Sequence, residues 1–118
     1  MKFLSCLGFL AGLLLLPIAP AFANAHLLKS SPANGARVRA PARILLTFSE
    51  ALEPAFSGAL LLDQDGRNWT AGPIKIDGPL LRLRPNQLLS PGVYTVSWHS
   101  VGHEGHRLDG RIQFTVRP

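Results

Sequence analysis

The stretch PGVYTVSWH, residues 91–99, is the most regular strand pattern in this chain of 118 residues, and it decides the fold. Tyr94, Val96 and Trp98 alternate with residues that are mostly polar, a period of two that is typical of a half-buried strand. The Pro-Gly pair before them is a turn signal. This stretch therefore predicts a β-strand whose aromatic face lies in a hydrophobic core.

Short runs of the same kind surround this stretch. Alternating residues predict strands at 43–49 and 111–116, and a continuous apolar run predicts another at 58–62. Shorter strands are predicted at 27–29, 67–70, 74–76 and 80–83, with Asp65-Gly66 turning a hairpin between 58–62 and 67–70. Prolines and glycines interrupt every window that could carry a helical period. The sequence thus predicts an all-β fold, an immunoglobulin-like Greek-key β-sandwich or barrel of about seven strands.

The first 25 residues have the layout of an export signal. A positive Met1-Lys2 precedes an apolar run over 3–16, then prolines and small residues, and this run is too short for a membrane-spanning helix. Cleavage after Ala23 or after Ala25 satisfies the small-x-small rule. We therefore predict a signal peptide over 1–25 and one exported domain over 26–118, too small to hold a second core.

The composition of the exported part restricts its chemistry. The single cysteine, Cys6, and the single methionine, Met1, both leave with the signal, so no sulfur ligand remains. Losing Lys2 leaves 11 Lys and Arg against 7 Asp and Glu, and the arginines are scattered rather than grouped with aromatic residues. This pattern argues against nucleic-acid binding. We expect a monomer.

All four histidines lie near the predicted cut or near one turn. His26 follows the cut, and His99, His103 and His106 lie in one short stretch near the other end of the chain. The segment HEGH, residues 103–106, offers imidazoles and a carboxylate, and Glu104 and His106 point the same way if the segment is extended. Nitrogen and oxygen donors without sulfur favour Cu(II) over Cu(I). Taken alone, the segment is more typical of a solvated polar loop than of a metal site.

The choice of cut changes the chemistry at the amino terminus. If His26 is the first residue, its amine and ring nitrogen form a chelate. If Asn24 is first, His26 is third, and amine, amides and imidazole can wrap Cu(II) or Ni(II) in a square plane. Both cuts give a terminus that can bind copper.

The combined motifs resemble the CopC family of periplasmic copper-resistance proteins over essentially the whole mature chain. They are AHL at 25–27, SSPANG at 30–35, TFSE at 47–50, FSG at 56–58, PGVYTVSW at 91–98, and GH at 105–106 followed by Gly110 and Phe114. The resemblance implies a seven-stranded immunoglobulin-like β-barrel that binds Cu(II) through an N-terminal histidine, an aspartate, and a histidine two residues further on. It further implies that copper is carried or buffered and passed to a CopD-like inner-membrane copper transporter.

Carried onto this chain, the family pattern selects His26, Glu104 and His106 as the metal ligands. Two departures stand out: Glu104 takes the place of the aspartate, and Asn24 takes the place of the usual first histidine. The methionine-rich Cu(I) site of some members has no counterpart. Glu50 and Glu53 are predicted to be surface residues, and His99 is a candidate for supporting the ligands from outside.

Two other functions compete with a copper carrier. One is an immunoglobulin-like interaction module with a vestigial metal site, which the missing first histidine favours. The other is a copper monooxygenase, which needs a broad aromatic substrate surface, whereas the mature chain holds only Trp69, Trp98 and one tyrosine apart from its phenylalanines. No pattern of Ser, His and Asp suggests a hydrolase, so we predict a binding protein, not an enzyme.

Overall fold

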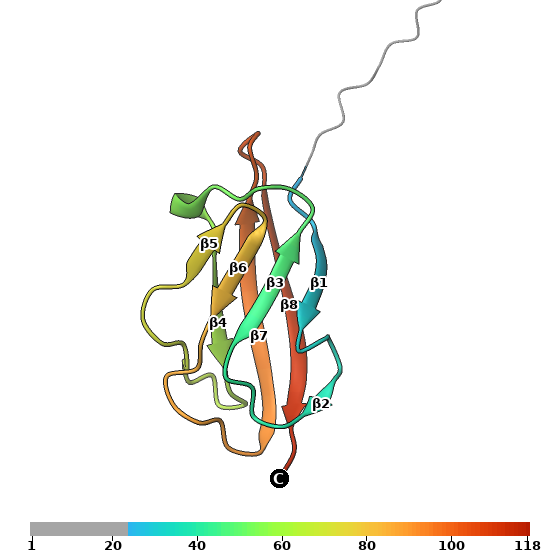
Figure 1. The fold of residues 1–118 in the computed structure, drawn as a ribbon, viewed down its shortest axis with the longest axis vertical. Helices are drawn as coiled ribbons and strands as arrows, with labels where there is room; N and C mark the ends of the chain where they lie inside the picture. The colour runs from blue at the N-terminus through green and yellow to red at the C-terminus, as the bar shows by residue number, and fades with distance from the viewer. Residues whose placement is uncertain (1–23) are drawn as a thin grey trace, which may run out of the picture.

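The computed structural model describes residues 24–118, which form two four-stranded β-sheets packed face to face (Figure 1). One sheet has the strand order β1-β3-β6-β5 and the other β2-β8-β7-β4. The predicted signal peptide lies outside the described residues except for its last two positions. Within residues 24–118, no helix is long and apolar enough to cross a membrane. The strands are β1 (Leu27–Ser31), β2 (Arg37–Val38), β3 (Ile44–Phe48), β4 (Gly58–Leu62), β5 (Lys75–Asp77), β6 (Leu80–Leu83), β7 (Gly92–Val101) and β8 (Arg107–Val116), with a short 3-10 helix η1 (Pro54–Phe56) before β4.

This topology confirms the predicted fold class. When the strands are lettered in chain order, with β2 as a side strand, the sheets become ABED and GFC, the arrangement of an immunoglobulin constant-type sandwich. The described residues contain eight strands rather than about seven, because two-residue β2 pairs in parallel with β8 at the edge of the second sheet. The hydroxyl of Tyr94, near the start of β7, donates to the Ser90 carbonyl at 2.7 Å. This contact is the tyrosine corner of such sandwiches.

The strand β7, which contains the stretch that decided the fold, runs through the centre of its sheet. It pairs with β8 over ten positions, from Gly92↔Val116 to Val101↔Arg107, and with β4 on its other edge. Tyr94, Val96 and Trp98 are all buried, as their spacing predicted. The Trp98 ring meets Phe48 of the opposite sheet edge to face, with ring centroids 5.2 Å apart. The two sheets are therefore joined through an aromatic contact at the centre of the core.

One predicted strand is wrong. The turn after β4 forms, and Gly66 takes a positive φ of 81° there, but residues 67–70 make only isolated bridges instead of a strand. The Asp63 carboxylate accepts hydrogen bonds from the backbone amides of Asp65 and Arg67 and from Trp69 Nε1, at 2.8 to 2.9 Å. The Trp69 and Arg67 donors hold the pKa of Asp63 below its ordinary value. The Asp63 side chain thus holds this segment as a loop. Strand β4 forms its ladder with β7 rather than with residues 67–70.

We predict that Gly110→Ala destabilises the sandwich. The Trp98 ring occupies the space that a methyl group at Gly110 would need, so the variant should lose about 1–3 kcal/mol of unfolding free energy in urea titrations. Gly58→Ala is the control, because a methyl there would meet the His99 imidazole at 3.1 Å, and that side chain can move. Equal losses in both variants would contradict this account of the Trp98 packing.

Candidate metal centre

The histidine loop, residues 102–106, is the tip of the β7–β8 hairpin at one end of the sandwich (Figure 1). The Gly105 amide donates to the Gly102 carbonyl at 3.0 Å, and Gly105 has a φ of 83°, a conformation that favours glycine. The side chains of His103, Glu104 and His106 are exposed. The segment HEGH thus lies in a tight turn between the last two strands.

Glu50 holds this loop, although the sequence suggested only a surface residue. Its carboxylate accepts a hydrogen bond from the His103 amide at 3.0 Å and packs against Gly102, where any side chain would collide with it. Glu50 is half-buried rather than exposed. Its position two residues after the end of β3 was the only available signal, and nothing in the sequence tied it to a loop about fifty residues away.

The N-terminal segment, Asn24 to His26, is fastened beside this loop. Ser49 Oγ accepts from the His26 amide at 2.8 Å and donates to the Asn24 carbonyl at 3.1 Å. The Ser49 amide donates in turn to the His26 carbonyl at 2.7 Å. These three contacts fix the path of the segment against the end of β3.

A buried hydrogen bond attaches the same segment to β7. Ser100 Oγ donates to the Ala25 carbonyl at 2.7 Å, and both residues are 0% exposed. Because Ser100 lies two residues before Gly102, this contact brings the N-terminal segment to the histidine loop. The structure therefore places the two predicted ligand segments at the same end of the fold.

The individual ligands are less closely arranged. The side chains of His26, Glu104 and His106 are all exposed at this end. Within the described part of the chain, no group of three or more His, Cys, Asp and Glu residues is arranged so that it could hold a metal ion. The segments meet, whereas the ligand set stays a prediction.

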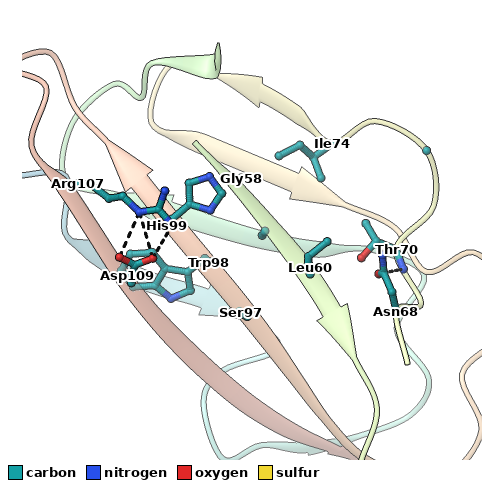
Figure 2. A pocket seen from close by; sticks show the side chains of 12 residues that line it. Gly58, Leu60, Asn68, Thr70, Ile74, Ser97, Trp98, His99, Arg107 and Asp109 are labelled. Atoms are coloured by element: carbon teal, nitrogen blue, oxygen red, sulfur yellow. Dashed lines mark hydrogen bonds and ion pairs between the residues drawn. The ribbon is translucent and has the colours of Figure 1, made fainter. Parts of the chain in front are cut away.

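His99 lies on the outer face of the second sheet (Figure 2), three residues before the histidine loop, and it lines a pocket together with Gly105 of that loop. It stands opposite Asp109 on β8 and Gly58 on β4, beside a pocket of about 490 Å³. Arg107 forms an ion pair with Asp109 at 2.9 Å, and its hydrogen bonds lower the pKa of that carboxyl. Partial burial, helped by the Arg107 charge, lowers the pKa of His99 despite Asp109. Both effects disfavour a positive charge on the His99 imidazole.

We predict that Ser100→Ala destabilises the protein, because the buried Ala25 carbonyl then loses its hydrogen-bond donor. The expected loss of unfolding free energy is about 1–3 kcal/mol in chemical denaturation. Ser97→Ala, on the same strand and half-buried, serves as the control and should change it by less than about 0.5 kcal/mol. If the two variants were equally stable, Ser100 would not anchor the N-terminal segment.

Comparison with known proteins gives a consistent result. The model of the CopC domain family matches residues 27–117. Copper resistance protein C of Xanthomonas campestris pv. juglandis is 37% identical over 107 residues, which cover 84% of each chain. The crystal structure of PcoC, a methionine-rich copper resistance protein from Escherichia coli, superimposes with a TM-score of 0.71 at 32% identity, covering 80% of this chain and 100% of that one.

A more distant relative is much longer. Copper transport protein CutJ of Bacillus subtilis is 27% identical over 99 residues, which cover 80% of this chain but only 18% of that protein. The matching region is thus a small part of a larger transport protein.

Proposed function

This chain belongs to the CopC family, and on that premise we propose that it is a periplasmic copper-resistance protein that binds Cu(II) and carries or buffers it. The observation that carries the proposal is the fastening of the N-terminal segment beside the histidine loop by Ser49 and Ser100. This arrangement brings the N-terminal segment and the histidine loop, which both carry nitrogen or oxygen donors, to the same end of the fold. The relatives named above are called copper resistance and copper transport proteins, which supports copper as the cargo.

The proposed ligands are His26, Glu104 and His106. Residues 24–118 contain neither cysteine nor methionine, so this part of the chain offers copper only nitrogen and oxygen. Such donors suit Cu(II) better than Cu(I). The three side chains are exposed on two neighbouring segments, so copper binding through them would require the side chains and the loop tip to turn toward one another.

We propose that the signal is cut after Ala23, so that Asn24 becomes the first residue. A cut after Ala25 would remove a fully buried side chain and leave the buried Ser100 hydroxyl without its acceptor. Such a loss costs about 1–3 kcal/mol. N-terminal sequencing of the exported protein tests this choice directly.

The fastening of the segment also bears on how it binds copper. A square-planar wrap would require the amides of Ala25 and His26 to lose their protons and face the metal. The His26 amide instead donates to Ser49, and Ala25 is buried. The folded segment therefore favours binding through the His26 ring together with the loop.

A hand-off to a CopD-like inner-membrane copper transporter is the proposed next step. Its support is the CutJ relative, a protein named for copper transport that contains a matching region within a longer chain. In Bacillus subtilis the matching region is joined to a copper transport protein in one chain. A separate protein with the same domain can serve a similar transporter.

The interaction module with a vestigial site is the second candidate. Asn24 in place of a histidine and the absence of an assembled cluster among residues 24–118 both favour it. The monooxygenase hypothesis has less support, because Phe56 is the only aromatic residue among the strongly exposed large apolar side chains described.

Copper titration of the untagged protein separates the first two candidates. We expect His26→Ala and His106→Ala each to weaken Cu(II) binding at least about tenfold, or roughly 1.4 kcal/mol. His103→Ala, the matched loop control, should weaken it less. A short tag remnant ahead of Asn24 should cost little affinity, because binding through the His26 ring and the loop does not use the free amine. If all these proteins bind Cu(II) equally, the copper-carrier proposal fails and the interaction module takes its place.

A further inference from the structure

We propose that the outer face of the β1-β3-β6-β5 sheet docks on a membrane surface rich in anionic phospholipid. Four cations form what we call the basic face: Arg43 just before β3, Lys75 on β5, and Arg82 and Arg84 on and just after β6. All four side chains are exposed. The proposal is independent of copper binding.

The strand register puts these cations in two neighbouring rows. Arg82 pairs with Leu45 on one side and Lys75 on the other. Ile44 pairs with Leu83, so the same register continued by one residue sets Arg43 opposite Arg84, in the next row on the same face of the sheet. A shallow pocket of about 380 Å³ is lined by all four cations together with Pro73 and Leu83. The four charges therefore surround one place on the sheet.

Fold stability does not account for this arrangement. Lys75 and Arg82 stand directly opposite each other on antiparallel strands, and like charges in that position are destabilising. Within residues 24–118, no carboxylate forms an ion pair with any of the four cations. Asp77, the acidic residue on the same strand as Lys75, pairs with Leu80, two positions along β5 from the Lys75–Arg82 pair. The charge is thus available for an anion outside the protein.

The shape and chemistry of the face favour phospholipid over an acidic protein. The cations project from one open sheet face, and three of them are arginines, whose guanidinium groups bind phosphate through paired hydrogen bonds. Protein interfaces usually centre on aromatic or other large apolar residues. The strongly exposed ones lie elsewhere: Phe56 in η1, Leu60 on β4, Leu88 before β7, and Leu28 at the bulge of edge strand β1.

The basic face also leaves the candidate metal centre open. Arg43 precedes the first residue of β3, whereas Ser49, which fastens the N-terminal segment, follows its last. The two features therefore lie toward opposite ends of the same strand (Figure 1). A protein attached through the basic face keeps its histidine loop accessible.

Vesicle sedimentation tests the proposal. The probe is the protein with vesicles of equal parts phosphatidylglycerol and phosphatidylcholine at low ionic strength, compared with pure phosphatidylcholine. We expect binding to the anionic vesicles alone and release in about 1 M salt, where the Debye length is about 3 Å. Each cation near such a surface contributes about fivefold in affinity, so Lys75→Gln/Arg82→Gln should bind about 25-fold more weakly.

A charge-matched control distinguishes the face from net charge. Arg37→Gln/Arg39→Gln removes two exposed arginines on and just after β2, in the other sheet, and should change vesicle binding less than about twofold. The Lys75/Arg82 variant should keep or raise its Tm, because a repulsive pair is gone. If its Tm falls instead, Arg43→Gln/Arg84→Gln replaces it in the same comparison.

Four results would overturn the proposal. They are no binding to anionic vesicles at low salt, equal losses in the two charge-matched variants, displacement by inorganic phosphate at constant ionic strength, and binding to polyglutamate but not to vesicles. The third would indicate a small-anion site, and the fourth an acidic protein partner. Copper titration of the same variants should give unchanged affinity, so failure here leaves the copper proposal intact, and the reverse also holds.

Discussion

The ten-residue ladder between β7 and β8 is the constraint on which the rest of this structure depends. It places Trp98 over Gly110 and against Phe48, and so joins the two sheets through the core. The same ladder ends in the turn that presents His103, Glu104 and His106. Because Ser100 belongs to β7, the ladder also positions the N-terminal segment. Core packing and the candidate metal centre therefore share a single hairpin.

Most of the fold could be predicted from local patterns. Alternation in β3, β7 and β8 requires only neighbours in sequence, and each of these strands formed with the expected residues inward. The stretch 67–70 failed because its pattern is equally compatible with a loop. The deciding contact there, from Trp69 Nε1 to Asp63, joins two side chains that no strand pattern relates.

The candidate site was predictable only in part. The chemistry of His26, Glu104 and His106 and the loop between the last two strands could be read from residue types and turns. Their support could not, since Ser100 reaches Ala25 and Glu50 reaches His103 across 75 and 53 positions of sequence. Such pairings depend on topology. The position of a serine or a glutamate near the end of a strand does not identify the residue that it contacts.

The burial of Ala25 sets an order of events for the proposed signal cleavage. A signal peptidase cuts an extended chain, yet the residue after Asn24 has no exposed surface and its carbonyl is held by Ser100. The proposed scissile bond after Ala23 is therefore separated from the buried residue Ala25 by Asn24 alone. Cleavage must come before this end docks, or must wait until it frays open. With the proposed cut, the N-terminal segment would thus be the last to fold, and the candidate metal centre would be the final part of the sandwich to form.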